Sequence, residues 1–349
     1  MSYDGFFDLL KPILLRLNPE LVHEKGLSTM ALFDAGYSLL KPLEQPKTIN
    51  PISLNGLNFS NRVGLAAGLD KNGMFVDLLS RFGFGAIEIG TVTPKPQKGN
   101  LKPRLFRLAN DGALINRMGF NNEGAEKILK NLGNSKWVKN QMGVLGVNVG
   151  INASTSLRDA YKDYNFCLEK FFPVADYFVI NISSPNTKNL RNLQSKDYFL
   201  DLLKKIKKHV ISLCAAHKCH RPLYVKLSPD LEAIEIENLS DVITKLEIEG
   251  LIISNTTEKR PSLEQKHCKE TGGLSGNPLK ASAEKILLSF RERLPSYVTM
   301  IGSGGIMTCK DALDRLNAGA DIVQFYTGLV YNGPSVIKET IESTGKLPA

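Results

Sequence analysis

Short apolar runs recur along most of the chain, and segments in which apolar residues repeat at helical spacing separate them. Runs of this length, rich in β-branched and aromatic residues, predict buried strands. Strands that alternate with helices favour an α/β fold, and eight of them with this regularity favour a closed (β/α)8 TIM barrel over an open sheet. The predicted strands are Val63–Ala67, Ala86–Gly90, Val144–Asn148, Tyr177–Asn181, Leu223–Leu227, Leu251–Ser254, Thr299–Gly302 and Ile322–Phe325.

One segment after the second predicted strand breaks the alternation. The apolar runs Arg104–Leu108 and Ala113–Ile115 flank Asn110-Asp111-Gly112. An Asp-Gly turn between two short apolar runs is a strong hairpin signal. We therefore expect a β-hairpin insertion at this point of the barrel.

Two helical patterns precede the barrel. Gly5–Leu17 is amphipathic and interrupted by Pro12, and Asn18-Pro19-Glu20 has the residues of a helix start for a second helix that runs to about Leu40. The first helix is too short for a bilayer span, and neither helix has the pattern of a cleavable signal. The pair either packs on the barrel or lies in a membrane interface. We expect an N-terminal helical domain, residues 1–42, and a barrel domain, residues 43–349, which begins with a proline-containing linker.

Composition narrows the class of partner. The chain has 349 residues, 42% of them hydrophobic, and a formal net charge of +9. A basic excess suits anionic ligands or an anionic membrane surface. No aromatic-basic pattern for nucleic acid is present, so we expect no nucleic-acid partner. The densest basic run, Lys204–Lys208, is interpreted as the solvated face of a helix.

The cysteines indicate reduced thiols. There are five, irregularly spaced, with no secretory signal before them, which favours a cytosolic setting. The cluster from Cys214 to His220 suggests metal binding on paper, but its spacing matches no common zinc pattern.

Polar residues and glycines gather where the predicted strands end, and in a barrel these ends share one face. The set has no His/carboxylate metal ligands and no opposed carboxylate pair, so we expect no metal and no glycosidase chemistry. It suits a cofactor that needs many hydrogen bonds and one positive charge. Its members are Ala67 to Lys71, Thr91, Asn148, Asn181 to Thr187, Lys226, Asn255, Thr256, Gly304, Gly305, Tyr326 and Thr327.

The loop Asn181–Arg191 follows the fourth predicted strand and is the densest of these polar segments. Pro185 keeps Ser184 out of the helical region, so the loop has a fixed shape. Such a loop at a barrel strand end is typical of an active site. An Asx/Ser-rich turn that caps the next helix is the alternative.

Glycines and lysines add two further expectations. Gly302-Ser303-Gly304-Gly305 and Tyr326-Thr327 occupy the usual phosphate site of a barrel, and Gly272–Gly276 is interpreted as a flexible loop for close backbone approach. Lys226 is placed to stabilise negative charge on a reduced cofactor, and Lys71 to meet a substrate carboxylate. A Schiff-base lysine is the alternative for either.

Five motifs, in order and spread over most of the chain, resemble those of the dihydroorotate dehydrogenase family. Helical residues 18–23 and a serine at position 184, where the soluble class has cysteine, are similar to the quinone-dependent, membrane-associated class 2. Ser254 departs from the threonine of many members but keeps the hydroxyl. The motifs are Leu65-Ala66-Ala67-Gly68-Leu69-Asp70-Lys71-Asn72-Gly73, Ile115-Asn116-Arg117-Met118-Gly119-Phe120-Asn121, Asn181-Ile182-Ser183-Ser184-Pro185-Asn186-Thr187, Thr271-Gly272-Gly273-Leu274-Ser275-Gly276 and Gly302-Ser303-Gly304-Gly305-Ile306.

The resemblance implies oxidation of (S)-dihydroorotate to orotate in pyrimidine (UMP) biosynthesis, with FMN as cofactor and a membrane quinone as acceptor. It assigns Ser184 as catalytic base and Thr187 as its proton relay. It implies a quinone path past His23, Arg107 and Tyr326. The implied FMN residues are Ala67, Gly68, Leu69, Asp70, Lys71, Thr91, Asn148, Asn181, Lys226, Ser254, Gly276, Gly305, Tyr326 and Thr327. The implied substrate residues are Lys71, Asn116, Arg117, Met118, Gly119, Phe120, Asn181, Asn186, Asn255 and Thr256.

The same resemblance implies a monomer, bound peripherally to the cytoplasmic side of the cell membrane through its N-terminal helices. Two alternatives stay open from the sequence. One is a soluble FMN-barrel oxidoreductase that uses fumarate or NAD. The other is a membrane-binding or scaffold protein whose barrel has lost its chemistry.

Overall fold

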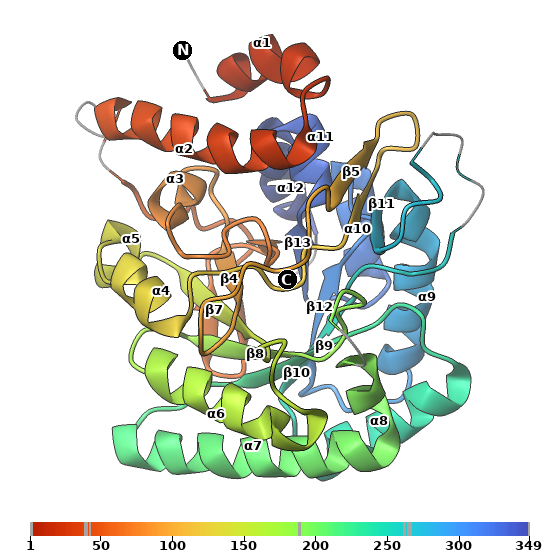
Figure 1. The fold of residues 1–349 in the computed structure, drawn as a ribbon. Coiled ribbons are helices and arrows are strands. Elements are labelled where there is room, and N and C mark those ends of the chain that lie inside the picture. The colour runs from red at the N-terminus through yellow and green to blue at the C-terminus, as the bar shows by residue number, and fades with distance from the viewer. Residues whose placement is uncertain are drawn as a thin grey trace.

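The computed structural model describes residues 3–37, 41, 43–187, 190–260, 263 and 267–347. Eight parallel strands close a barrel in the order β10-β12-β13-β3-β4-β7-β8-β9, which confirms the predicted TIM barrel (Figure 1). Three strand ranges match the prediction at both ends, and the others differ by one or two residues. The strands are β3 Val63–Leu65, β4 Ala86–Val92, β7 Val144–Val149, β8 Tyr177–Asn181, β9 Leu223–Leu227, β10 Gly250–Ile253, β12 Thr299–Ser303 and β13 Ile322–Phe325.

Helices cover the outside of the barrel, and the main core lies between them and the strands. On β8, Phe178 and Ile180 belong to this outer core, whereas Tyr177 and Val179 fill the barrel interior. This alternation follows from the two-residue period of a strand. The covering elements are α3 Val76–Ser80, α4 Ala125–Leu132, α5 Lys136–Lys139, η1 Leu157–Asp159, α6 Ala160–Phe171, η2 Leu190–Gln194, α7 Lys196–His217, α8 Ala233–Lys245, η3 Asn277–Leu279, α9 Lys280–Arg291, α10 Cys309–Asn317, α11 Thr327–Asn332 and α12 Ser335–Thr344.

A short hairpin, β1 Ile52–Leu54 and β2 Leu57–Phe59, closes the end of the barrel where the strands begin. No pattern in the sequence predicts this hairpin, because two strands of three residues give too little periodicity. Phe59 packs on Tyr177 and Tyr224 inside the barrel. Gly146 makes room for Tyr177, since a Cβ there would lie 2.2 Å from the tyrosine ring. The hairpin therefore fills the lower barrel with apolar side chains.

The predicted insertion hairpin is present as β5 Leu105–Leu108 and β6 Ala113–Asn116. A third strand, β11 Gly273–Gly276, pairs antiparallel with β6. The interpretation of this glycine-rich segment as a flexible loop is therefore wrong. Local sequence shows no strand period there, and only the backbone of β6 supplies the partner for its hydrogen bonds.

The N-terminal helices are α1 Tyr3–Leu14 and α2 Pro19–Tyr37, which lie across the end of the barrel that carries β5 (Figure 1). Asn18 caps α2 as predicted, because its Oδ1 accepts hydrogen bonds from the N–H of Glu20 and Leu21. Pro12 does not interrupt α1, contrary to expectation, since the helix continues past it to Leu14. Residues 38–40, the predicted end of the second helix, lie outside the described residues. None of the helices in the described ranges is long and apolar enough to cross a bilayer.

Ion pairs hold α2 on the barrel. Glu20 accepts a 2.9 Å hydrogen bond from Arg104, and both side chains are only 6% exposed. Asp34, near the other end of α2, pairs with the largely buried Arg81. Arg107 donates to the carbonyls of Leu15 and Leu17 and so fixes the turn between α1 and α2. The helical pair is thus docked at several points along its length.

We predict that Glu20→Gln destabilises the protein by about 3 kcal/mol, because breaking a buried ion pair leaves the Arg104 charge uncompensated. Glu24→Gln is the matched control. Glu24, also on α2, forms an ion pair with Lys102, but the Glu24 side chain is 46% exposed. The Glu24→Gln substitution should therefore lower the free energy of unfolding by less than about 1 kcal/mol. Urea unfolding of both variants measures the difference, and equal effects would contradict the role assigned to the Glu20–Arg104 pair.

Candidate active site

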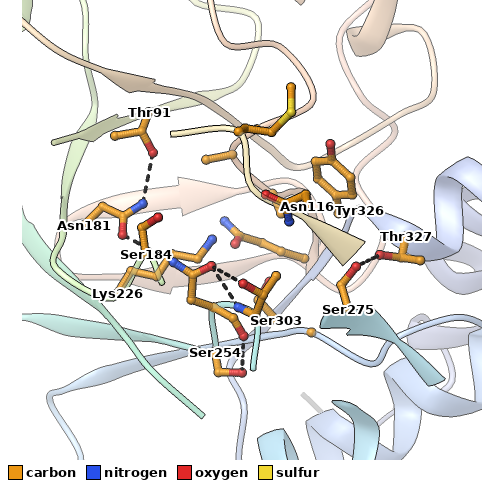
Figure 2. A pocket seen from close by; sticks show the side chains of 18 of the residues that line it. Thr91, Asn116, Asn181, Ser184, Lys226, Ser254, Ser275, Ser303, Tyr326 and Thr327 are labelled. Carbon is orange, nitrogen blue, oxygen red and sulfur yellow. Dashed lines mark hydrogen bonds between the residues drawn. The ribbon is translucent and has the colours of Figure 1, made fainter. Parts of the chain in front are cut away.

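A polar cavity opens where the barrel strands end, beside the sheet of β5, β6 and β11 (Figure 2). Its empty space is about 1010 Å3, a volume that includes open solvent at the mouth. Loops from far-apart parts of the chain contribute the lining. The lining residues are Ala66, Ala67, Gly68, Lys71, Thr91, Asn116, Met118, Gly119, Phe120, Asn181, Ser184, Asn186, Lys226, Ser254, Asn255, Thr256, Ser275, Leu279, Ser303, Gly304, Gly305, Ile306, Gln324, Tyr326 and Thr327.

Most of the residues to which the resemblance assigns a catalytic, cofactor, substrate or quinone role meet in this cavity, and eight of them do not line it: Leu69, Asp70, Arg117, Asn148, Thr187, Gly276, His23 and Arg107. Ala66, Leu279, Ile306 and Gln324 line it without having been assigned a role. The position of Gln324 in the cavity was predictable from the two-residue period of a strand. It lies two residues before Tyr326 in β13, so it faces the barrel interior as Ile322 does.

An amide and hydroxyl network forms one wall of the cavity. Asn181 Nδ2 donates to Thr91 Oγ1 at 3.0 Å (Figure 2). Asn148 Oδ1 accepts from Thr91 Oγ1 at 2.6 Å and from Asn181 Nδ2 at 3.1 Å. Asn148 is fully buried behind this wall and donates in turn to Glu88. Asn148 therefore orients Thr91 and Asn181 from behind.

Glu88 lies under the cavity with a fully buried carboxylate. It accepts hydrogen bonds from Asn148 and, at 2.7 Å, from Gln324 Nε2. Burial lowers the pKa of Lys226, and the Glu88 charge partly opposes that shift. A carboxylate only accepts, so the Gln324 amide nitrogen faces Glu88, and its buried Oε1 has no donor among the described residues. A residue of the cavity lining thus carries a buried acceptor that no donor among the described residues uses.

Lys71 joins the cavity to helix α2. Its Nζ donates to the Gly68 carbonyl at 2.7 Å and lies 3.2 Å from Nε2 of His23. Burial and the Arg104 charge lower the pKa of Lys71 to about 8. Burial, with Lys71 as a second cause, holds the pKa of His23 well below its usual value. His23 is therefore neutral and accepts from the ammonium group.

Asp70, next to Lys71, shapes the loop instead of facing the cavity. Its buried carboxylate accepts from the backbone N–H of Asn72, Met74 and Phe75. Burial raises the pKa of Asp70, while these hydrogen bonds act in the opposite direction. The loop holds Lys71 in place as a result.

The loop after β8 faces residues from β6 and from the segment after β10. Asn186 Nδ2 donates to Asn116 Oδ1 at 3.1 Å, and Asn255 Nδ2 donates to Ser183 Oγ at the same distance. Ser184 is buried, and its Oγ accepts from the Asn186 N–H. Arg117, which was expected to bind the substrate, forms an ion pair with Glu270 and does not line the cavity. This part of the cavity presents amides and hydroxyls suited to a flat polar ring.

The glycine turn after β12 borders the opposite side of the cavity. Gly304 and Gly305 both have positive φ, and a Cβ on Gly305 would lie 2.3 Å from the Lys280 Cα. Only glycine fits this turn. Thr327 Oγ1 and Ser275 Oγ lie 2.9 Å apart beside it (Figure 2). Backbone and hydroxyl groups of this kind suit a phosphate.

The three residues of the expected quinone path take different positions. Tyr326 lines the cavity, and burial raises its pKa to about 12. His23 reaches the cavity only through Lys71, and Arg107 binds the carbonyls between α1 and α2. All three therefore lie at or near the junction of the helical pair and the barrel.

A TIM barrel with a polar cavity, a glycine turn and two enclosed lysines has the build of a cofactor-dependent enzyme. Within the described ranges, no group of three His, Cys, Asp or Glu side chains is placed to hold a metal ion, and His220 of the cysteine-histidine cluster instead contacts Glu249. The family model described as Dihydroorotate dehydrogenase matches residues 51–347. The chain belongs to the dihydroorotate dehydrogenase family.

Curated relatives and solved structures agree with the family. A protein of Psychrobacter arcticus named Dihydroorotate dehydrogenase (quinone) is 44% identical over 341 residues, 97% of each chain. One of Acinetobacter baylyi with the same name is 44% identical and covers 97% of this chain and 99% of its own. The crystal structure of DHODH in complex with ferulenol from Eimeria tenella matches with a TM-score of 0.84 and 37% identity, over 95% of this chain and 93% of that one.

We predict a pH signature for Lys71. Its pKa falls from 10.5 to about 8 on folding, so the native state binds fewer protons than the unfolded state between these pH values. The cost of burying the ammonium is complete below pH 8 and is relieved as the pH rises toward 10.5. In ligand-free protein, the free energy of unfolding of wild type should therefore increase relative to that of Lys71→Met as the pH rises from 8 to 10.5. A difference that stays constant with pH would contradict the assignment.

Proposed function

We propose that this chain oxidises (S)-dihydroorotate to orotate in pyrimidine biosynthesis, with FMN bound in the cavity and a quinone as final acceptor. Family membership and the names of the curated relatives support the substrate and the quinone. They favour this reaction over the fumarate- or NAD-dependent alternative. The observation that carries the proposal is the convergence of the expected residues in one cavity at the strand ends.

The cavity has the groups that FMN needs. The glycine turn with Tyr326 and Thr327 would hold the phosphate, and Lys226 and Gln324 Oε1 would face polar atoms deeper in the cavity. When bound, FMN supplies the hydride acceptor. The other lining residues proposed to hold FMN are Ala67, Gly68, Lys71, Thr91, Asn181, Ser254 and Gly305. Asn148, Leu69, Asp70 and Gly276 do not line the cavity and are proposed to support these residues.

Substrate binding rests on charge and on amide geometry. The Lys71 ammonium would meet the substrate carboxylate, which repays the cost of enclosing this charge. Asn116, Asn186, Asn255 and Thr256 would orient the flat ring and so supply the proximity contribution to the rate. Met118, Gly119 and Phe120 complete this side of the cavity.

Ser184 is proposed as the base that removes a proton from the substrate ring. A serine hydroxyl is a weak base by its intrinsic pKa, so it needs an exit for the proton. Thr187 lies three residues further on, outside the cavity lining, and would relay the proton through water. The enclosed setting of Ser184 limits competition from bulk solvent.

The helical pair is proposed to bind the cytoplasmic side of the membrane as a peripheral contact of a monomer, with residues 1–42 forming the quinone entrance to the barrel domain of residues 43–349. Large apolar side chains are exposed on it, among them Ile13 at 58%, Leu21 at 51% and Leu32 at 77%. An amphipathic surface of this kind suits the headgroup boundary. Quinone would then pass His23 and Arg107 toward Tyr326.

We predict that Ser184→Ala retains FMN and binds orotate but reduces its flavin about 10²- to 10⁴-fold more slowly, because a general base contributes on that scale. Bleaching of the yellow protein by dihydroorotate, followed in a single turnover, measures the rate. Thr187→Val is the comparison and should slow the step less, since it removes only the exit route. Wild type that holds FMN but is not bleached would reject the proposed reaction itself, and near-normal reduction by Ser184→Ala would reject the base.

We also predict that the two half-reactions separate in a chain lacking residues 1–40. Flavin reduction should survive, because every cavity-lining residue is retained. Turnover with a long-tailed quinone and sedimentation with anionic vesicles should both fall sharply. Unchanged reduction of the long-tailed quinone would contradict the role of the helical pair.

The truncation also removes the partners of Arg104, Arg81 and Lys71, so a full-length control is needed. Leu21→Ser combined with Leu32→Ser alters only exposed side chains of α2 and leaves these contacts in place. This variant should lose vesicle binding while it keeps turnover with a short, water-soluble quinone.

A further inference from the structure

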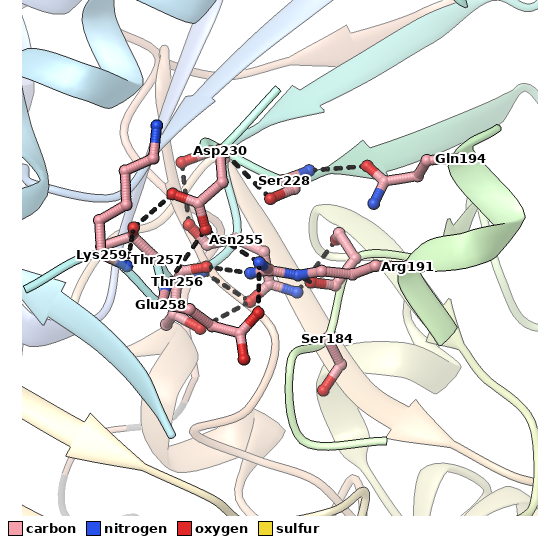
Figure 3. Close-up of polar contacts among 12 residues, drawn as sticks. Ser184, Arg191, Gln194, Ser228, Asp230, Asn255, Thr256, Thr257, Glu258 and Lys259 are labelled. Carbon is pink, nitrogen blue, oxygen red and sulfur yellow. Dashed lines mark hydrogen bonds and ion pairs between the residues drawn. The ribbon is translucent and has the colours of Figure 1, made fainter. Parts of the chain in front are cut away.

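Arg191 forms the hub of a polar network just outside the cavity (Figure 3). It lies in η2, at the end of the loop that follows β8, and its side chain is 20% exposed. Its Nη1 donates to Asp230 Oδ2 and to Glu258 Oε2, both at 2.9 Å. The guanidinium group does not line the cavity, so it contacts neither the cofactor nor the substrate site directly.

The remaining donors of Arg191 bind two backbone carbonyls that matter for the site. Its Nε donates to the carbonyl of Ser183 at 3.2 Å, and its Nη2 donates to the carbonyl of Thr256 at 2.9 Å. Ser183 immediately precedes Ser184, and Thr256 itself lines the cavity beside Asn255. One planar group therefore links the loop of the candidate base to the segment that would hold the substrate ring.

Asp230, in the loop after β9, is hydrogen-bonded both to Arg191 and to the segment that follows Thr256. It accepts hydrogen bonds from the Thr257 hydroxyl and from the Glu258 N–H, in addition to Arg191. The Asp230 N–H donates to Ser228 Oγ, and the Ser228 N–H donates to Gln194, which follows Arg191 in η2. The loops after three successive barrel strands, β8, β9 and β10, are closed into one hydrogen-bonded unit (Figure 3).

We propose that Arg191 is a positioning residue for the reaction, which sets the placement of Ser184 relative to the substrate ring held by Asn255 and Thr256. This inference rests on the proposed function. A guanidinium group suits the task because its fixed fork bonds in several directions within one plane, whereas a lysine ammonium is a point charge on a flexible stem. Replacement by lysine keeps the charge but loses the link between the two carbonyls.

Arg291 provides a matched control within the same barrel. It also pairs with an aspartate, Asp321, at 2.7 Å and donates to two backbone carbonyls, those of Val298 and Gly319. Its exposure of 25% is similar to that of Arg191. These contacts precede β12 and β13, at the end of the barrel opposite the cavity. Arg291→Lys therefore tests loss of the same kind of bonds away from the site.

The experiment compares Arg191→Lys and Arg291→Lys in the full-length, FMN-loaded protein. We expect Arg191→Lys to slow single-turnover flavin reduction by dihydroorotate about 10- to 100-fold, because small misplacements of reacting groups cost on this scale. Its FMN content and thermal midpoint should match those of Arg291→Lys, which should reduce flavin at the wild-type rate. In Arg191→Ala, added methylguanidinium should restore part of the rate and methylammonium should not.

A second readout does not depend on activity. In protein without substrate, amide hydrogen exchange in residues 182–187 should be faster in Arg191→Lys than in wild type or Arg291→Lys. Wild-type exchange in this loop together with a wild-type reduction rate overturns the inference, as does equal slowing by both lysine variants. Should Arg191→Lys not fold, Asp230→Asn weakens the same unit from the partner side and is judged by the same criteria. If wild type itself is not reduced, the proposed function fails, and hydrogen exchange alone decides whether Arg191 positions the loop.

Discussion

The buried carboxylate of Glu88 divides the interior of this barrel into two halves. Below it, Phe59, Tyr177 and Tyr224 fill the barrel with apolar side chains. Above it, Asn148 and Gln324 donate from their amide nitrogens to the same carboxylate, and the Asn148 oxygen accepts from Thr91 and Asn181 of the cavity wall. A buried carboxylate is tolerated only when donors satisfy it, and here the donors are the residues that build the site. The Glu88 charge also acts to raise the pKa of Lys226, against the lowering caused by burial.

Helix α2 is joined to the barrel by buried ion pairs and by a hydrogen bond to a cavity residue. The Glu20–Arg104 and Asp34–Arg81 pairs fix α2, and His23 accepts from Lys71 within the same interface. Arg104 also binds the carbonyls of Lys98 and Asn100, and Asn100 contacts the loop that carries Asn186. The docking of α2 is therefore connected to the substrate side of the cavity through a few hydrogen bonds. The proposed membrane contact and the proposed catalytic site would share one interface in this way.

Interactions between loops decide how the strand ends become a site. Arg191 and Asp230 join the loops after β8, β9 and β10 on one side, while Gly304 and Gly305 turn tightly beside Thr327 on the other. Family membership indicates which reaction such a cavity serves. These contacts hold separate loops at fixed distances, which is the requirement for acid-base chemistry on a bound ring.

The amino-acid pattern alone was enough for the barrel, because each strand is a local run with its own periodicity and the eight runs alternate with helices. It was also enough for most cavity residues, since strand ends such as Asn181 and Lys226 share one face in any such barrel. Tertiary contacts decided the rest. The strand β11 exists only because β6 lies beside it, the hairpin β1–β2 only because it covers apolar side chains, and Gln324 faces its carboxylate only inside the closed barrel. The contacts concerned join residues far apart in the chain, such as β11 with β6, Phe59 with Tyr177, and Gln324 with Glu88, so no local run of sequence contains them.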